Sequence, residues 1–351
     1  MDRARGAAST PLPWRRARRD AERDREIATL TLLRRLIAAT LLVAASPTLA
    51  QPFPDRPVRI IVPINPGGGT DIYARALAEI AAPALGQPVI VENRPGASGT
   101  IGVQQIVEAR PDGLTLGFVW NTPLTAAPHT LGARYTAESF SSIFTVGYSA
   151  YTLCARPDFP ANTLTEMIAA IRARPATYSW GNEGLGGTMH LGVARVLQSL
   201  GLDMTTVPFQ GAGQTLPAFL GGHITFYGGS VVGVIGAARA GQARCLLLTT
   251  AEGHPELPNA SGVASIGLAD HAITIWWGLI APNGIAADRM ARLREVFVGA
   301  AQTPRFRQVV EGTGATYAIV EGELMAAATR AEYEALGAVA RSLGLTRAAP
   351  R

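Results

Sequence analysis

Residues 58–71 read VRIIVPINPGGGTD, a short apolar run followed by a turn rich in proline and glycine and then an acidic residue. The run of β-branched residues predicts a buried strand, Val58–Val62. Apolar residues recur at every fourth position of 71–85, which is the spacing of one face of a helix. A strand, a glycine-rich turn and a helix in this order are typical of the first unit of a parallel α/β sheet.

The same alternation continues on the C-terminal side of this stretch. Pro88–Val91 and Leu114–Trp120 are predicted strands, with a second glycine-rich turn and a helix ending near Ala109 between them. The alternation restarts after Pro160 with further helices and short strands, which predicts a second α/β unit. The last 70 or so residues are mainly helical and are expected to return and complete the first unit.

The sequence therefore predicts an α/β fold with two doubly wound domains, joined by two crossing strands at Ala150–Ala155 and Ala243–Thr249. Two lobes joined in this way can close on a ligand in the cleft between them. The predicted division is an N-terminal extension and signal peptide (1–50), domain 1 (51–152 plus 250–351) and domain 2 (153–249).

The net charge of +5 belongs to the N-terminal extension. Residues 1–50 contain ten arginines and five acidic residues, and subtracting these from the chain's 31 and 26 leaves 21 of each. A nucleic-acid-binding protein needs a basic surface on its folded part. The neutral remainder argues against that class of function.

The chain contains no lysine. This excludes a P-loop lysine on ATP, a Schiff base with pyridoxal phosphate and a kinase-type lysine. The five histidines lack metal-ligand spacing, and no nucleophile elbow or Ser/His/Asp order is present. The sequence thus predicts no enzyme, no metal and no cofactor.

Residues 34–50 have the three parts of a secretory signal peptide. Arg34 and Arg35 precede an apolar run, Leu36–Ala45, and small residues lead to a cleavage site near Ala50. The apolar run is too short to span a bilayer. An exported, periplasmic protein is expected, by the Sec or the Tat route. Two cysteines, Cys154 and Cys245, are then either a disulfide or two buried thiols.

Two glycine-rich turns are the candidate binding elements. The first spans 63–71, and the second is Gly96-Ala97-Ser98-Gly99-Thr100. Each lies between a strand and a helix, so its backbone N–H groups and the positive end of the helix dipole suit an anion. Both turns follow adjacent parallel strands and should face one crevice, where they would bind a carboxylate. The alternative is an ordinary turn whose helix is capped by Thr70 or Asp71.

The residues around these turns resemble the Bug family of periplasmic receptors, the solute-binding components of tripartite tricarboxylate transporters. The resemblance covers Gln51 to about Leu343. It is carried by the following segments: VRIIVP (58–63), PGGGTD (66–71), VENRPGA (91–97), GTIG (99–102), PDG (111–113), VPFQG (207–211), LGGH (220–223) and WGL (277–279).

The resemblance implies a type II periplasmic-binding fold without catalysis, with a di- or tricarboxylate or an aromatic acid bound between the domains. The receptor would capture this small carboxylate by domain closure and deliver it to the inner-membrane permease subunits of a tripartite tricarboxylate transporter. The implied ligand-binding residues are Gly67, Gly68, Gly69, Thr70, Ser98, Gly99 and Thr100 on one side and Gly186, Gly187, Thr188, Phe209, Gln210 and Gly211 on the other.

The chain departs from the family pattern at several positions. Asn65 stands where a small residue is usual and is expected to add a polar contact. Phe209-Gln210 replaces a tyrosine and a basic residue, and no Asp follows Phe226-Tyr227-Gly228-Gly229. Glu183 would be an unfavourable neighbour for a dicarboxylate and is expected to face solvent.

Three further residues are candidates for the cleft. Trp120 and Asn121, at the end of a strand, are expected to face the cleft. His190 is either a ligand contact or a packing or capping residue. For the whole chain, a transport receptor is predicted; the alternatives are a periplasmic ligand sensor of the same fold that feeds a signalling partner, and a periplasmic hydrolase.

Overall fold

The computed structural model describes residues 53–347 and, before them, only Arg18, Arg23, Arg25, Thr29, Leu30, Thr31 and Arg34. The description that follows concerns the unit Phe53–Arg351. The predicted signal peptide and its cleavage site lie, apart from Arg34, outside the described residues. Within the part that is described, no helix combines the length and the apolar character needed to cross a membrane.

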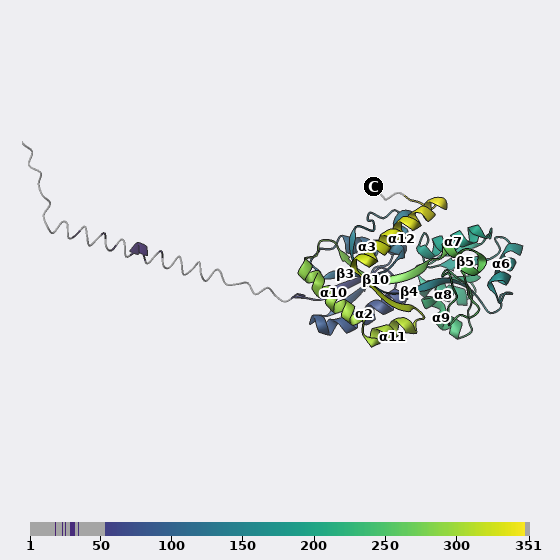
Figure 1. Ribbon diagram of the computed structural model, residues 1–351, viewed down its shortest axis with the longest axis horizontal. Coiled ribbons are helices and arrows are strands. Elements are labelled where there is room, and N and C mark those ends of the chain that lie inside the picture. Colours follow the sequence, from purple (N-terminus) through teal and green to yellow (C-terminus); the bar gives the residue numbers. More distant parts are fainter. Residues whose placement is uncertain are drawn as a thin grey trace, which may run out of the picture. The chain divides into compact units, whose positions relative to one another are not determined.

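The folded unit is built on one curled sheet with helices on both faces (Figure 1). Its first half has the strand order β2-β1-β3-β10-β4, with β11 also paired to β4. The three predicted strands are confirmed within two residues, and β1 runs parallel to both β2 and β3. The strands of this half are β1 (Val58–Val62), β2 (Val89–Asn93), β3 (Thr115–Trp120), β4 (Phe140–Ala155), β10 (Thr274–Pro282) and β11 (Thr316–Glu321).

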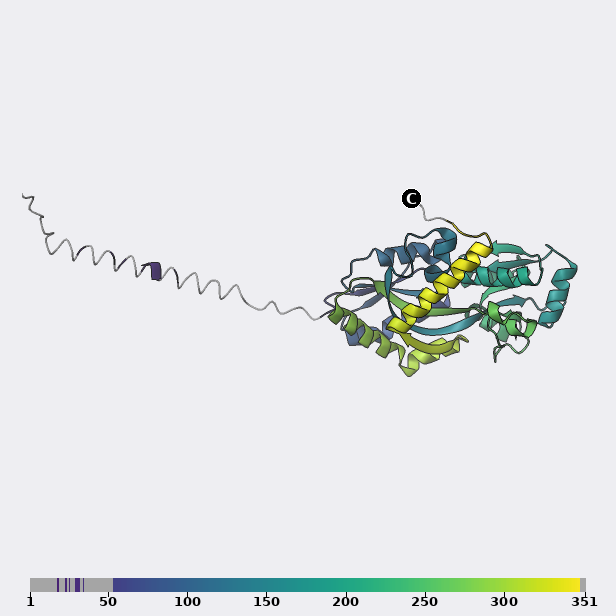
Figure 2. The same ribbon diagram turned by 45° about the horizontal axis from the view of Figure 1, so that its top comes forward.

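The helices of the first half cover both faces of its strands (Figure 1). Helices α2, α10 and α11 pack together on one face, and α3 and α4 on the other. Helix α12 contacts β4 and also α7 of the second half, and it runs diagonally across the folded unit (Figure 2). The bounds are α2 (Gly69–Leu85), α3 (Thr100–Val107), α4 (Thr122–Thr125), α5 (Ala127–Leu131), α10 (Ala287–Ala301), α11 (Pro304–Gly312) and α12 (Gly322–Ser342).

The second half of the sheet continues the strand order through β4-β7-β5-β6. Strand β5 is parallel to β6 and β7, whereas β7 and β8 are antiparallel to β4. Its elements are α6 (Leu164–Ala173), β5 (Ser179–Asn182), α7 (Thr188–Ser199), β6 (Thr205–Pro208), α8 (Ala212–Leu220), β7 (Phe226–Ser230), α9 (Val231–Arg239), β8 (Arg244–Leu248) and β9 (Ser261–Gly262).

Strand β4 joins the two halves of the sheet. Its first part pairs with β10 and β11, and its last five residues pair with β7 and β8. The predicted crossing at Ala150–Ala155 is therefore the end of a strand of 16 residues.

The second crossing differs from the prediction. Strand β8, predicted to cross at Ala243–Thr249, pairs only with the end of β4 and with β9, so it stays in the second half. The chain returns instead through β10, which begins at Thr274. Thr249 marks the junction, because its backbone N–H donates to Tyr151 O at 2.9 Å and its hydroxyl donates to Ile273 O at 2.8 Å. The division into domains at 152/153 and 249/250 stays a prediction.

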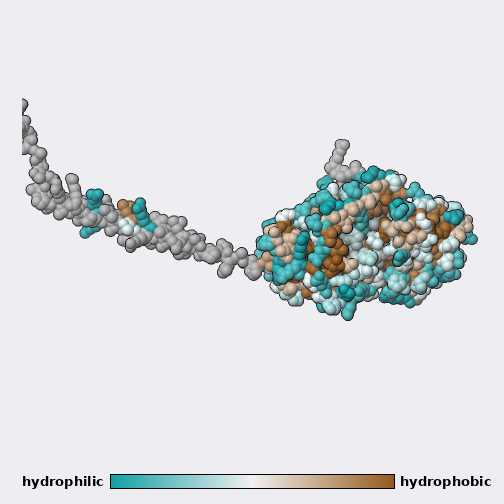
Figure 3. All heavy atoms as spheres, in the orientation of Figure 1, coloured by the Kyte–Doolittle hydropathy of each residue, from teal (hydrophilic) through white to brown (hydrophobic). Residues whose placement is uncertain are grey.

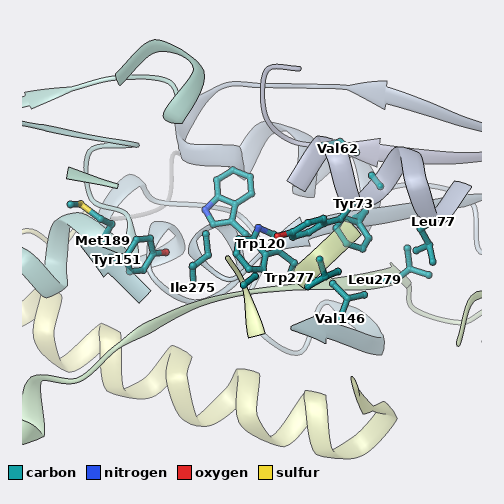
Figure 4. Packing of buried hydrophobic residues seen from close by; sticks show 14 of the residues in the cluster. Val62, Tyr73, Leu77, Trp120, Val146, Tyr151, Met189, Ile275, Trp277 and Leu279 are labelled. Atoms are coloured by element: carbon teal, nitrogen blue, oxygen red, sulfur yellow. The ribbon is translucent and has the colours of Figure 1, made fainter. Parts of the chain in front are cut away.

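The core lies between the sheet and its helices. Tyr73 of α2 meets Trp277 of β10 edge to face, with 5.1 Å between ring centroids (Figure 4). Both rings are fully buried. On the face shown in Figure 3, hydrophilic residues follow most of the outline of this unit and hydrophobic residues lie between them.

Cys154 and Cys245 form a disulfide in the structure. The two residues lie opposite each other on the neighbouring antiparallel strands β4 and β8. The sequence allows either a disulfide or two buried thiols, and the structure has the disulfide. It ties the end of β4 to a strand 91 residues later in the chain.

We expect the double variant Cys154→Ala/Cys245→Ala to lower the free energy of unfolding by about 2–4 kcal/mol, because the bond restricts the unfolded chain over a long loop. Urea unfolding with and without a reductant measures this effect. The wild-type midpoint should fall on reduction and the variant midpoint should not move. Equal wild-type midpoints, with reduction verified by thiol titration, would contradict the prediction.

Candidate functional site

The first glycine-rich turn is held by a polar cluster behind it. The Asp71 carboxylate accepts hydrogen bonds from Gly67 N at 3.1 Å, Arg75 Nε at 3.0 Å and Asn93 Nδ2 at 2.9 Å. Asn93 also donates to Ile64 O at 3.0 Å. Burial acts to raise the pKa of Asp71, but these three hydrogen bonds together hold it below its usual value. Arg75 is thus an ion-pair partner of Asp71.

Asp71 is not the helix cap. The N-cap of helix α2 is Gly68, which has no side chain that could accept a hydrogen bond from the first turn. Thr70 and Asp71 lie inside the helix and are buried. The alternative of an ordinary capped turn is therefore wrong for this loop, and the first-turn amides receive no side-chain cap.

The second turn is tightly wound. Ala97 and Ser98 have φ of 46° and 50°, in the left-handed region that costs energy for residues with a side chain. The Thr100 hydroxyl donates to Ala97 O at 2.9 Å and holds this conformation. Helix α3 then starts after Gly99, again without a side-chain cap.

A cavity of about 300 Å³ lies between these turns and the loops of the second half. A second cavity of about 350 Å³ adjoins it and shares Ile64, Gln210 and Gln214. The first is lined by Pro63, Ile64, Pro95, Gly96, Ala97, Ser98, Gly99, Trp120, Leu131, Glu183, Gly184, Leu185, Pro208, Phe209, Gln210 and Gln214. The second is lined by Ile64, Asn65, Pro66, Gly68, Gln210, Gly211, Ala212, Gly213 and Gln214.

Seven of the fifteen predicted ligand-binding residues line these cavities. They come from both halves of the sheet, as the prediction of a cleft requires. These residues are Asn65, Gly68, Ser98, Gly99, Phe209, Gln210 and Gly211.

Four predicted residues of the two first-half turns do not line either cavity. Gly67 is exposed and bonded to Asp71. A Cβ on Gly69 would lie 2.8 Å from Val232 Cγ1 of α9, so this glycine allows a close contact between the halves. Thr70 is buried in the first turn of α2. Thr100 uses its hydroxyl within its own turn.

Gly186, Gly187 and Thr188 hold the halves together and do not face the cavities. The Thr130 hydroxyl donates to Gly186 O at 2.8 Å, and Thr188 N donates to Thr122 Oγ1 at 3.2 Å. The Ser98 hydroxyl makes a third contact of this kind, to Leu185 O at 3.1 Å. Gly187 packs against Thr122. These contacts bring the loops of the two halves against each other.

Asn121 is turned away from the cavities. Its side-chain amide donates to Thr274 O at 3.0 Å and to Glu332 Oε1 at 2.6 Å, and the residue is fully buried. Trp120, the residue before it, lines the first cavity. The expectation that both face the cleft is therefore wrong for Asn121, because this residue follows the end of β3 with helical backbone angles, at the start of α4, and is bonded to Thr274 and Glu332.

His190 is a packing residue and lines neither of the two cavities. Its Nδ1 accepts from Gly186 N at 3.2 Å, and its ring stacks on Trp180 with 5.9 Å between centroids. Burial lowers the pKa of His190, which keeps the ring neutral. Among the described residues, no three His, Cys, Asp or Glu side chains are grouped so that they could hold a metal ion.

The sequence also placed Glu183 wrongly, since it predicted that this residue faces solvent. Its side chain lines the cavity, and its Oε1 accepts a hydrogen bond from the Tyr227 hydroxyl at 2.7 Å. Burial raises the pKa of Glu183 to about 7, although hydrogen bonds from Tyr227 and Ser230 act against this rise. The sequence could have predicted this position, because Glu183 directly follows a parallel strand and residues there face the crevice.

The cavities offer backbone amides and no cationic side chain. Helices α2, α3 and α8 begin after Gly68, Gly99 and Gly211, none of which can cap with a side chain. All three glycines line a cavity. The lining residues include no Arg or His, and Glu183 is the acid among them. Such a site attracts an anion through helix N-termini.

The comparisons with known proteins agree on one family. The model described as the tripartite tricarboxylate transporter family receptor matches residues 73–344. A UPF0065 protein of Bordetella pertussis is 33% identical over 285 residues, which cover 81% of this chain and 88% of that protein. The structure of the periplasmic binding protein BugD is 27% identical, with a TM-score of 0.76, and the match covers 84% of this chain and 99% of BugD.

A second solved structure is MatC from Rhodopseudomonas palustris with bound malate. It is 26% identical with a TM-score of 0.75, and the match covers 82% of this chain and 99% of MatC. These similarities confirm the predicted fold class, a two-lobed periplasmic-binding fold of α/β type.

We expect Glu183→Gln to stabilise the protein at pH 8 by about 2–3 kcal/mol more than at pH 4.5. The folded pKa of Glu183 lies at about 7, above the usual 4.5. Between these values the folded state binds the proton better than the unfolded state, so wild-type stability falls as pH rises through this window. Urea unfolding at both pH values measures the difference. An exposed glutamate, Glu252→Gln, is the control; an equal gain at both pH values would contradict the assignment.

Proposed function

The chain belongs to the tripartite tricarboxylate transporter family of receptors, and from this premise we propose that it is a periplasmic solute-binding receptor without catalytic activity. It captures a small carboxylate, a di- or tricarboxylate or an aromatic acid, when its two lobes close. It then delivers this ligand to the permease subunits of a tripartite tricarboxylate-type transporter in the inner membrane. Family members are periplasmic binding proteins.

One observation carries the choice of ligand: three helices begin at glycine N-caps on two adjoining cavities, and no described residue that lines either cavity has a cationic side chain. Uncapped N–H groups at helix N-termini bind oxyanions without a counter-charge from lysine or arginine. The malate bound to MatC, a related protein, supports the same chemistry. Carboxylate capture by backbone amides is therefore the function that the site favours.

The contacts between the halves support capture by closure. Ser98, Thr130 and Thr122 of the first half bond to the loop 185–188 of the second half. A ligand held between the halves would add its own contacts to this set and favour the closed arrangement. Gly186, Gly187 and Thr188, which were predicted to bind the ligand, thus act in closing the lobes.

We expect a panel of di-, tri- and aromatic carboxylates to contain at least one that raises the melting temperature of the purified protein by about 5 °C. A ligand at one hundred times its Kd stabilises the folded state by about 2.7 kcal/mol. A thermal-shift assay measures this, with the uncharged amides of the same carbon skeletons as controls. If no acid shifts a sample shown by circular dichroism to be folded, carboxylate capture is excluded.

We expect Gly68→Val and Thr100→Val each to weaken carboxylate binding by about tenfold and to leave the fold intact. Valine at 68 has room, since the nearest atom to its Cβ is Ile64 Cδ1 at 3.8 Å, but it fills the cavity edge at the α2 N-terminus. Valine at 100 removes the hydrogen bond that holds the second turn.

Calorimetric titration of both variants tests this placement. Gly299→Val is the matched control, because Gly299 is exposed on α10 and a Cβ placed there would meet no neighbouring heavy atom within 4 Å. Wild-type affinity in both site variants would show that these turns do not hold the ligand.

A further inference from the structure

The Glu183 carboxylate occupies a space built for it. Tyr227 of β7 donates to it, and two glycines leave room beside it. A Cβ on Gly229 would overlap Glu183 Oε1, and a Cβ on Gly233 of α9 would lie 3.2 Å from the same oxygen. Three separate elements, β5, β7 and α9, thus position this acid at the cavity wall.

The acid lines the cavity from the second half of the sheet, whereas the glycine-rich turns line it from the first half. Glu183, Gly184 and Leu185 form the second-half wall, whereas Gly96, Ser98 and Gly99 form the first-half wall. A ligand whose carboxylate is bound by the first-half turns would direct its other end to Glu183. Nothing else among the lining residues carries a charge.

No cation from the packed elements faces Glu183. Tyr227 on β7 and Tyr151 on β4 are buried, and burial raises both pKa values well above the usual 10, so both phenols are neutral. His190 on α7 is kept neutral by burial. The other neighbours are Ser230 at the end of β7 and Gly233 of α9, neither of which carries a charge. Asp71 at the α2 N-terminus is paired with Arg75.

We propose that Glu183 selects the far end of the ligand, so that the receptor prefers monocarboxylates with a hydroxyl, amino or amide donor at that end over dicarboxylates of equal length. This inference rests on the proposed function, because it takes the first-half turns as the binding site of the carboxylate. An ionised Glu183 accepts hydrogen bonds from a donor. A second carboxylate would instead face a like charge in a partly desolvated cavity, without a cation to offset it.

A dicarboxylate can still bind if Glu183 takes up a proton from solvent, because its carboxyl O–H then donates a hydrogen bond to the second carboxylate. The pKa of about 7 makes this possible near neutral pH, and a second negative charge nearby raises it further. The affinity for dicarboxylates should therefore fall up to tenfold per pH unit above about pH 7, whereas acids with a donor end should bind equally well across this range.

Calorimetric titration of the purified protein at pH 6 to 8.5 tests the inference with chain-matched probes. The pairs are succinate and 4-hydroxybutyrate, glutarate and 5-hydroxypentanoate, and terephthalate and 4-(hydroxymethyl)benzoate. At pH 8 the hydroxy acid of the best-binding pair should bind at least tenfold more tightly than its dicarboxylate partner. Glu183→Gln should abolish the pH dependence and strengthen dicarboxylate binding at pH 8 by about tenfold, and the exposed Glu252→Gln should change neither.

Tyr227→Phe provides a second test that keeps the acid in place. Loss of the hydrogen bond to Oε1 removes an interaction that favours ionised Glu183, so the decline of dicarboxylate binding should move to higher pH. Equal binding of both members of a pair in wild type, unchanged in Glu183→Gln, would overturn the inference while carboxylate capture stands. If no acid binds the folded protein, the proposed function fails and the inference fails with it.

Discussion

The continuous backbone hydrogen bonding of β4 is the constraint on which the rest of the structure depends. Its first residues pair with β10 and β11 and its last with β7 and β8, so one strand belongs to both halves of the sheet. Thr249 bonds to Tyr151 of β4 and to Ile273, just before β10, and so places the return of the chain beside the same strand. The loops at the strand ends of the two halves can then meet only across a narrow cleft. The disulfide of Cys154 and Cys245 ties this strand to β8 on the second-half side.

Glycine allows the two sets of loops to approach each other. Gly69 meets Val232, Gly211 meets Ile64 and Gly186 meets Thr130, and in each pair a side chain of one half fills the space that a Cβ of the other half would need. The same residue type leaves the helix N-termini without side-chain caps. Both the close contact between the halves and the exposed first-turn amides thus arise because glycine has no side chain. A larger residue at these positions would both separate the halves and cover the amides.

The sequence predicted those features that depend on local pattern. Strand β1 and the neighbouring strands follow from apolar runs, and the glycine-rich turns follow from composition between a strand and a helix. The features that it missed depend on contacts between distant segments. Gly186, Gly187 and Thr188 have the same strand-to-helix position as the first two turns, but Thr122 and Thr130 of the other half occupy their polar groups. The inward position of Glu183 depends on Tyr227, Gly229 and Gly233. The pairing of the cysteines required the knowledge that β8 lies beside β4.

The charge distribution of the cavity follows from the absence of lysine and the placement of arginine. Arg75, the arginine at the first turn, is held by Asp71 and Asn93 behind the loop, so its charge does not reach the cavity as a free cation. Attraction for an anion must then come from helix N-termini, whose partial charges act over short distances and are fixed in direction. A carboxylate can be bound at such a terminus, but a second negative group several ångströms away gains little from it. From the second half of the sheet, Glu183 adds a negative charge to the cavity whenever it is ionised. The site is therefore polarised from one wall to the other, and a ligand that matches it has a negative end and a donor end.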